Sequence, residues 1–391
     1  MDSFNFDEII DRTQTGSIKY DLREPFEAPT DAIPLWVADM DFRTVPEVVE
    51  AMIRASQHGI FGYTHAENAF FEALHDWMAH YFDWETQREM WVQTPNVMFG
   101  VAAAIRVLTR EDDGVLIQTP VYDPFMHVVT RNARRVVINE LRRDSDGRYV
   151  VDFEDFEAKI VKNRPKAFLL CSPHNPVGRV WSRAELLKMG EICCQHGVKI
   201  ISDEIHFDFI YPGASHTVFA TLSEELAQNC VVCTSPTKTF NLAGVQIANI
   251  YAQNAEIHTA LRAECQKFCW YGANSIALAA AQAAYLHGYA WRDALIAYLG
   301  ENVDFVRSSL NSMTSKIHLT PIEGTYLLWL DCCALEKSDA ELRRFFLQDA
   351  KIWCSPGAIY GPGGSGFMRM NVACPRKILE RAMGQLANAL D

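Results

Sequence analysis

Short runs of apolar, mostly β-branched residues alternate with longer helix-like stretches through the central part of this chain. Each run is apolar almost throughout, as is typical of a strand that is buried on both faces of a sheet. Strands that alternate with helices predict a doubly wound, mainly parallel α/β sheet. The predicted strands are Val115–Ile117, Arg135–Ile138, Ala167–Cys171, Lys199–Ile201, Val231–Thr234 and Ile247–Tyr251.

The stretch between the third and fourth of these strands has signals for both ends of a helix. Ser182 can cap the first turn, and Glu185 three residues later completes a capping box. Gly197 can end the helix, because glycine readily adopts the left-handed conformation found after a last turn. A helix is therefore predicted between two parallel strands.

The pattern changes after about residue 285, where strands and helices no longer alternate regularly. We interpret this part as a smaller α+β domain that the N-terminal segment joins. A chain of 391 residues also exceeds what one core usually organises. The predicted division is residues 1–48 as the joining segment, 49–285 as the large domain and 286–391 as the small domain. The expected strands and helices of the last part are Lys316–Asp331, Phe367–Ala373, Trp291–Ser312, Asp339–Asp349 and Arg376–Leu390.

Composition argues against several classes of function. The 36 basic and 49 acidic residues give a net charge of −13, which repels nucleic-acid phosphates and anionic membrane surfaces. The acidic N-terminus lacks the pattern of a signal peptide, and no apolar run approaches the roughly 20 residues of a membrane span. We therefore expect a cytoplasmic protein with neither a nucleic-acid nor a membrane partner.

Polar residues follow four of the predicted strands. In an open α/β sheet, ligands bind beyond the carboxyl ends of the strands, so these residues should gather at one edge of the sheet. Together they supply an aromatic ring, an amide, a carboxylate, hydroxyl groups and a lysine. The four segments are Thr119–Tyr122, Ser172–Pro176, Ser202–His206 and Ser235–Lys238.

This set of groups fits pyridoxal 5′-phosphate. The cofactor needs a lysine amine to hold its aldehyde, and Lys238 in a partly desolvated place can have a lowered pKa. It needs a carboxylate against the pyridine nitrogen, for which Asp203 is the candidate. Tyr122 can cover the face of the ring, and Asn175 can donate to the phenolic oxygen.

The phosphate of such a cofactor requires backbone N–H groups at a helix N-terminus together with hydroxyl groups. Val97 and Met98 precede a helix pattern over residues 100–109 and can supply the N–H groups. Ser235 and Thr237 can supply the hydroxyls.

Eight segments, in order and almost from end to end, resemble the fold-type I pyridoxal-phosphate enzymes of the class I/II aminotransferase group. Within this group the chain is similar to the cystathionine β-lyase, or cysteine C–S lyase, branch. The resemblance implies a large doubly wound domain and a smaller α+β domain. The segments are Trp36–Phe42, Phe61–Tyr63, Thr119–Tyr122, Ser172–Gly178, Ser202–His206, Ser235–Asn241, Glu323–Tyr326 and Gly366–Asn371.

The resemblance also implies roles for residues of this chain. Lys238 would hold the cofactor and, once freed by the substrate, move the Cα proton. Arg369 would bind the substrate carboxylate through its bidentate fork, with Asn175 beside it. The backbone at Ala38 would help to close the substrate pocket. Tyr63 would reach the cofactor phosphate or the substrate of a neighbouring subunit, which implies a homodimer with shared active sites.

Departures from the aminotransferase pattern favour the lyase branch. Gln246 stands where aminotransferases usually have a phosphate-binding arginine, and His206 would contact the cofactor where many have tyrosine. Residues 94–99, in contrast, depart from the lyase pattern, because they lack the glycine and extra proline often found there in lyases. The implied reaction is β-elimination of a sulfur-containing L-amino acid to a thiol, pyruvate and ammonia. Transamination of L-amino acids is the alternative, since both reactions begin by moving the Cα proton.

Alternatives from other classes also exist. The carboxylates and histidine of residues 203–208 could bind a metal as in a hydrolase, although on an extended segment Asp203 and His206 would point to opposite faces. The glycine-rich residues 361–366 lack the lysine of a P-loop and instead predict a turn that delivers Arg369. A regulatory binding protein could use the same fold and would keep its function after Lys238→Ala.

Overall fold

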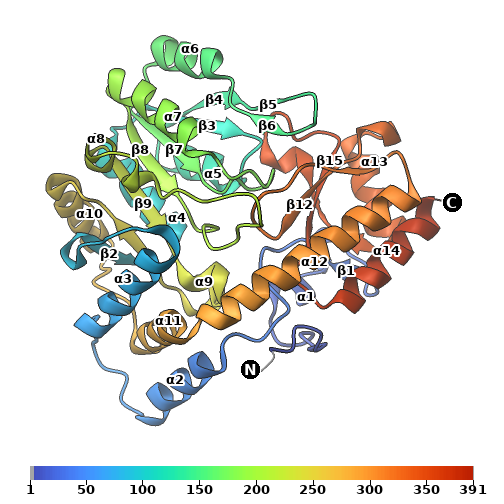
Figure 1. Cartoon of the computed structure of the whole chain (residues 1–391), viewed down its shortest axis with the longest axis horizontal. Helices are drawn as coiled ribbons and strands as arrows, with labels where there is room; N and C mark the ends of the chain where they lie inside the picture. The colour runs from blue at the N-terminus through green and yellow to red at the C-terminus, as the bar shows by residue number, and fades with distance from the viewer. Residues whose placement is uncertain (1–3, 391) are drawn as a thin grey trace.

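The computed structural model describes residues 4–390, and its largest element is a seven-stranded sheet (Figure 1). β10 is antiparallel to both of its neighbours, and the remaining pairings are parallel. The predicted doubly wound, mainly parallel sheet is thus confirmed. In spatial order its strands are β2 (Trp91–Thr94), β10 (Ala248–Tyr251), β9 (Cys230–Thr234), β8 (Lys199–Asp203), β7 (Ala167–Cys171), β3 (Gly114–Thr119) and β4 (Arg135–Glu140).

Side chains from successive strand residues enter two different hydrophobic clusters, one on each face of this sheet. Leu116 belongs to one cluster, whereas its neighbours Val115 and Ile117 belong to the other. Every residue of β3, β7 and β9 is buried. Helices on both faces therefore explain why these strands are apolar throughout.

The helices of this part cover the two faces of the sheet. α4, α5 and α10 contribute side chains to one cluster, and α6, α7 and α11 contribute to the other. The helices are α2 (Pro46–Gln57), α3 (Asn68–Phe82), α4 (Val97–Leu108), α5 (Pro124–Arg131), α6 (Phe153–Asn163), α7 (Arg183–Gln195), α8 (Glu224–Gln228), α9 (Pro236–Thr239), α10 (Ala255–Lys267) and α11 (Ser275–His287).

Helix α7 begins and ends as predicted. The Ser182 side chain accepts the Glu185 N–H, and the Glu185 side chain accepts the Ser182 N–H, so that both halves of the capping box are present. Gly197 follows with a φ of +67°, which glycine adopts without strain.

A second, antiparallel sheet contains β11 (His318–Leu319), β12 (Leu327–Asp331), β15 (Phe367–Asn371) and β14 (Ser355–Pro356). The prediction of one strand over Lys316–Asp331 was wrong, because Pro321 and Gly324 lie in an irregular stretch that separates β11 from β12. The helix predicted over Asp339–Asp349 is α13 (Asp339–Arg344) followed by a π-helical turn (Phe345–Asp349). The long helix α12 (Tyr289–Met313) packs against α14 (Arg376–Leu390) (Figure 1).

The N-terminal segment lies against the C-terminal part of the chain. β1 (Ile33–Pro34) pairs in parallel with β13 (Ile352–Trp353), and Trp36 stacks on Trp353 with ring centroids 4.6 Å apart. The domain boundaries themselves remain a prediction. The remaining short elements are α1 (Ile18–Asp21), the hairpin β5 (Arg142–Arg143) and β6 (Tyr149–Val150), and the 3₁₀ turns Glu24–Phe26, Arg88–Met90, Phe219–Thr221, Ala243–Val245, Cys333–Leu335 and Gly357–Tyr360.

Candidate active site

A cavity of about 240 Å³ lies at the carboxyl edge of the large sheet. All of the site residues predicted from the sequence line it except Ser235, Tyr63 and Arg369. The strand ends therefore bring together the groups that the sequence placed there. The lining residues are Ala38, Pro95, Asn96, Val97, Met98, Tyr122, Cys171, Asn175, Asp203, Ile205, His206, Thr237, Lys238, Ala243 and Gln246.

Lys238 lies on the short helix α9, directly after strand β9. Ser235 caps this helix by accepting the Thr237 N–H at 3.1 Å. The Nζ atom of Lys238 donates to the carbonyl oxygen of Ala38. Burial lowers the pKa of this amine to about 8. The negative charges of Asp39 and Asp203 oppose this shift, and the positive charge of Arg369 adds to it. A substantial fraction of the amine is therefore neutral near physiological pH and able to react.

Asp203 is the last residue of β8, and its carboxylate accepts the Ile205 N–H at 3.1 Å. Burial raises the pKa of this carboxyl to about 7. Within residues 4–390 no lysine or arginine forms an ion pair with it. A cationic ring nitrogen placed against Asp203 would restore the charged form, because an opposite charge favours ionisation.

The chain turns immediately after Asp203 and does not continue as a strand. The expectation that Asp203 and His206 point apart was therefore wrong, since both line the cavity. Burial holds the pKa of His206 well below its usual value, so the imidazole is neutral, and its Nδ1 atom is buried without a partner in the part of the chain described. Glu204 turns away and accepts the Phe219 N–H at 2.9 Å.

Arg369 reaches the site from β15 of the second sheet. Its Nη1 atom donates to Asn175 Oδ1 at 3.1 Å, and Nη2 donates to the Trp36 carbonyl at 2.7 Å. The guanidinium carbon lies 5.1 Å from the centre of the Tyr360 ring. Although Arg369 does not line the cavity directly, it contacts Asn175, which does. A carboxylate bound there would lie beside the groups at the strand ends.

The N-terminus of α4 forms another side of the cavity. The Asn96 side chain accepts the Phe99 N–H at 2.9 Å. The N–H groups of Val97 and Met98, in the first turn, have no partner within the helix. They are suited to an anion such as a phosphate. Gln246, which departs from the usual arginine, accepts a hydrogen bond from Asn96 Nδ2 at 3.3 Å.

Two predicted residues are placed differently. The Ser235 hydroxyl is fully buried and donates to the Ile247 carbonyl at 2.7 Å, so it supports α9 and does not line the cavity. Tyr63 lies in the stretch between α2 and α3 and is fully exposed, away from the cavity of its own chain.

Asn241, Asn371 and Tyr326 have structural roles that the sequence motifs did not reveal. Each makes hydrogen bonds to the backbone of residues 37–42, and the Tyr326 hydroxyl donates to the Ala38 carbonyl at 3.1 Å. Asn241 has a φ of +56°, a conformation that asparagine tolerates better than most residues. An asparagine three positions after the lysine was the available sequence signal.

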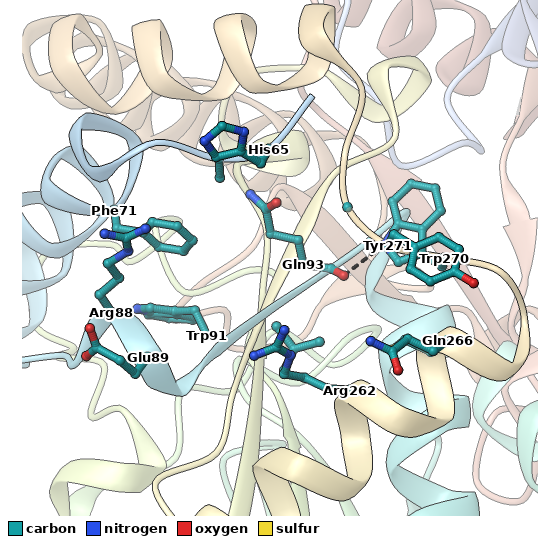
Figure 2. A pocket seen from close by; sticks show the side chains of 14 residues that line it. His65, Phe71, Arg88, Glu89, Trp91, Gln93, Arg262, Gln266, Trp270 and Tyr271 are labelled. Carbon is teal, nitrogen blue, oxygen red and sulfur yellow. Dashed lines mark hydrogen bonds between the residues drawn. The ribbon is translucent and has the colours of Figure 1, made fainter. Parts of the chain in front are cut away.

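A second cavity, of about 430 Å³, lies elsewhere (Figure 2). Its lining comes from the stretch before α3, from α3 itself, from the 3₁₀ turn Arg88–Met90, from β2 and from the C-terminal part of α10 with the residues that follow it. Arg88, Glu89 and Arg262 in this lining are exposed. Within residues 4–390 it shares no lining residue with the first cavity, so it is not part of the same site.

Cys230 and Cys233 have the CxxC spacing that often marks a zinc or redox site. Both lie on β9, where residues three apart point to opposite faces, and they belong to different hydrophobic clusters. No group of three or more His, Cys, Asp or Glu residues that could hold a metal ion occurs between residues 4 and 390. In the same range, no helix is long and apolar enough to cross a membrane.

The groups around the first cavity match what pyridoxal phosphate requires. They include an amine of lowered pKa, a buried carboxylate that a cation would stabilise, an aromatic ring and free N–H groups at a helix N-terminus. The neutral His206 leaves a buried nitrogen available for a further hydrogen bond. Fold and site together define the class of the chain as a pyridoxal-phosphate enzyme.

Comparison with known proteins identifies the family. Residues 30–386 match the model of the aminotransferase class I and II family, and the chain belongs to this family. It is 40% identical to the cystathionine beta-lyase PatB of Bacillus subtilis (strain 168) over 386 residues, which cover 99% of this chain and 100% of the relative.

Solved structures give the same result. Cystalysin from Treponema denticola, which contains a pyridoxal 5′-phosphate cofactor, has a TM-score of 0.95 and 34% identity, over 99% of this chain and 98% of its own. The PLP-bound C–S lyase from Staphylococcus hominis has a TM-score of 0.92 and 30% identity, over 99% and 98%. The fold-type I architecture expected from the sequence is therefore confirmed.

Proposed function

We propose that the chain is a pyridoxal-phosphate-dependent carbon–sulfur lyase, similar to cystathionine β-lyase, that acts on sulfur-containing L-amino acids. The observation that carries this proposal is the arrangement of Lys238 and Arg369. Both donate to carbonyls of one short stretch, those of Ala38 and Trp36. The guanidinium of Arg369, which suits a carboxylate, thus lies close to the reactive amine of Lys238. The chemistry at the Cα of an amino acid requires this arrangement. Lyase names among full-length relatives favour elimination over transamination.

The residues that would hold the cofactor surround the cavity. Lys238 would bind its aldehyde and Asp203 its ring nitrogen, while Tyr122 would cover the ring. Asn175 and His206 would contact the phenolic oxygen. The phosphate would lie at the N–H groups of Val97 and Met98, with the Thr237 hydroxyl beside them. When bound, pyridoxal phosphate supplies an electron sink that stabilises negative charge at the substrate Cα.

The side chains of this protein would then direct the reaction. Arg369 binds the substrate carboxylate through two parallel hydrogen bonds and so fixes the position of Cα. Lys238, in its neutral form, takes the proton from Cα. The sulfur leaves Cβ and acquires a proton to become a thiol. Hydrolysis of the remaining three-carbon fragment gives pyruvate and ammonia.

The experiment that tests this function measures pyruvate and thiol from L-cystathionine, with no 2-oxo acid added. We expect equal amounts of pyruvate and thiol from the wild-type enzyme and none from Lys238→Ala. If neither product forms, but an added 2-oxo acid becomes aminated, the chain is an aminotransferase and the lyase proposal is wrong.

We further propose that the active protein is a homodimer with shared active sites. Tyr63 is exposed together with neighbouring apolar side chains on the same stretch, Ile60 and Phe61, and with Val49 and Ile53 of α2. Exposed apolar surface of this kind is typical of an interface. In a two-fold dimer, Tyr63 of one subunit would reach the cavity of the other.

Mixing two inactive variants tests this sharing. Tyr63→Ala and Lys238→Ala should each be inactive alone, but a mixed dimer would contain one site with both wild-type residues. After subunit exchange at equal amounts, random pairing should restore about a quarter of wild-type activity. No recovery, with mixed dimers verified by mass spectrometry, would show that Tyr63 does not serve the other subunit.

We place the protein in the cytoplasm. All eleven cysteines are free thiols, as is usual in a reducing compartment. Cell fractionation with an antibody to the protein checks this assignment.

A further inference from the structure

Residues 36–42 bring two backbone carbonyls to the active site. The Trp36 carbonyl accepts Arg369 Nη2 at 2.7 Å, and the Ala38 carbonyl accepts both Lys238 Nζ and, at 3.1 Å, the Tyr326 hydroxyl. This segment lies between β1 and α2 and belongs to no helix or strand. Its conformation must therefore be fixed by contacts other than a regular hydrogen-bond ladder.

Asn371 binds the carbonyls on both sides of Ala38. Its Nδ2 atom donates to Val37 O and to Asp39 O, each at 2.6 Å. Its Oδ1 atom accepts the Ala373 N–H at 2.7 Å, and the residue is only 1% exposed. Asn371 thus fixes the carbonyls on both sides of Ala38. The Ala38 carbonyl itself accepts hydrogen bonds from Lys238 and Tyr326.

Asn241 fixes the other end of the segment and connects it to the lysine. It lies three residues after Lys238. Its Oδ1 atom accepts the Met40 N–H at 3.0 Å, and Nδ2 donates to Met40 O at 2.8 Å and to Phe42 O at 3.1 Å. The chain that carries the amine is thereby tied to the chain that carries its acceptor.

We propose that Asn371 and Asn241 are positioning residues for Lys238, which orient the Ala38 carbonyl so that it holds the lysine amine whenever the amine is free. A neutral amine that donates an N–H to this carbonyl keeps its lone pair available for the Cα proton. The inference rests on the proposed role of Lys238 as the base, but not on the cleavage of a C–S bond. Neither asparagine lines the cavity.

The test measures removal of the Cα proton without elimination. The holoenzyme is incubated with L-alanine in D₂O, and the loss of the Cα proton is followed by NMR. L-Alanine has no leaving group on Cβ, so the exchange reports proton transfer alone. For Asn371→Ala we expect the exchange rate to fall about 10- to 100-fold, because small misplacements of a reacting group have effects of this size. Cofactor content and the Kd for L-alanine, from spectral titration, should stay near wild type.

Two further variants make the result specific. Asn241→Gly retains a residue that accepts the positive φ and removes the side-chain hydrogen bonds, so it should also slow the exchange. Asn139→Ala is the matched control, since Asn139 is a fully buried asparagine on β4 whose Nδ2 donates to Asp152 O at 3.3 Å and to Asp155 Oδ2 at 3.0 Å. Asn139 lies away from residues 36–42, so the Asn139→Ala enzyme should exchange the Cα proton at the wild-type rate.

The outcomes separate this inference from the proposed lyase function. The positioning role is wrong if either asparagine variant retains the cofactor and exchanges the Cα proton at the wild-type rate. It is also wrong if Asn139→Ala slows the exchange as much as Asn371→Ala does. If Asn371→Ala loses the cofactor, Asn241→Gly decides. If the wild-type enzyme does not exchange the Cα proton of L-alanine, Lys238 is not the base, and the inference fails with that role. The wild-type enzyme could exchange the proton, with both variants slower, and still form no pyruvate from L-cystathionine. That outcome would support the positioning roles, while the lyase proposal would fail.

Discussion

The two sides of the active-site cavity are held in place by different means. On one side, Asp203 ends strand β8, and Asn175 and Lys238 follow β7 and β9, so the backbone ladder of the large sheet positions them. On the other side, residues 36–42 have no ladder and depend on side-chain hydrogen bonds from Asn241 and Asn371. A sheet supplies rigid positions for side chains, whereas the second side supplies backbone carbonyls whose direction must be set one hydrogen bond at a time.

Charged side chains add to the support of the second side. Lys19 is fully buried and pairs with Asp41 at 2.8 Å, and Arg12 pairs with Asp39 at 2.7 Å. Breaking a buried pair by removing one partner is costly, so the Lys19–Asp41 contact in particular opposes movement of residues 36–42. The N-terminal residues thus belong to the support of the active site, although they lie far from it in the sequence.

The largest effect is expected on the sheet side, from Asp203→Asn. Loss of one partner of a buried charge pair costs about 3–5 kcal/mol, which corresponds to a decrease of about 10²- to 10⁴-fold in kcat. The cofactor absorbance should also change, because the proposed partner of its ring nitrogen is lost. Steady-state kinetics and absorption spectra of the purified variant measure both effects.

Glu204→Gln is the matched control for this prediction. Glu204 is the next residue and a fully buried carboxylate, but it contacts Ser202, His216 and the Phe219 N–H instead of the cavity. The control should lose thermal stability and retain the wild-type spectrum. An equal loss of kcat in both variants would mean that burial of any carboxylate at this strand end, and not contact with the cofactor, explains the effect.

The next largest effect should come from Arg369→Lys, on the side of residues 36–42. Lysine keeps the charge but cannot make two parallel hydrogen bonds to a carboxylate, and hydrogen bonds to charged groups contribute about 1.5–3 kcal/mol. We expect KM for L-cystathionine to rise about 10- to 100-fold, with smaller changes in kcat and in cofactor content. A fall in kcat at unchanged KM would contradict the assignment of Arg369 to substrate binding.

The third prediction concerns pH, at the point where the two sides meet. In protein stripped of its cofactor, the pKa of Lys238 is about 8, and only the neutral amine reacts with an aldehyde. The neutral fraction grows as pH rises, so the rate of cofactor uptake should increase about tenfold per pH unit below 8 and level off above it. Stopped-flow absorbance measures this rate.

Asp39→Asn sharpens this prediction. The charge of Asp39 raises the pKa of Lys238, as that of Asp203 does, whereas Arg369 lowers it. Removing the Asp39 charge should therefore move the midpoint of cofactor uptake to a pH below that of the wild type. A midpoint shifted upwards would show that residues 36–42 influence the lysine through their shape and not through charge.

The same contrast explains how much of the molecule could be predicted from its sequence. The six predicted strands and the polar residues after them were found because buried strands and strand ends leave periodic signals. β2 was missed because its four residues include the polar Gln93 and Thr94. The turn that brings His206 beside Asp203, and the hydrogen bonds of Asn241 and Asn371 to backbone carbonyls, leave no periodic signal. The hydrogen bonds of Asn241 and Asn371 also join residues up to 334 positions apart.

The smallest effect is expected from Ser182→Ala, in the capping box of α7. This helix connects β7 to β8 and so supports the sheet side without touching the cavity. Loss of an N-cap costs about 1 kcal/mol of unfolding free energy. Denaturant unfolding should show this loss, while the L-alanine exchange rate stays at the wild-type value, since the backbone ladder still positions Asp203. Asn371→Ala, in contrast, should slow the exchange even where its cofactor content is unchanged. If Ser182→Ala also slows the exchange, the sheet is less rigid than its ladder suggests, and the two sides of the cavity do not differ in the way they hold the reactive groups.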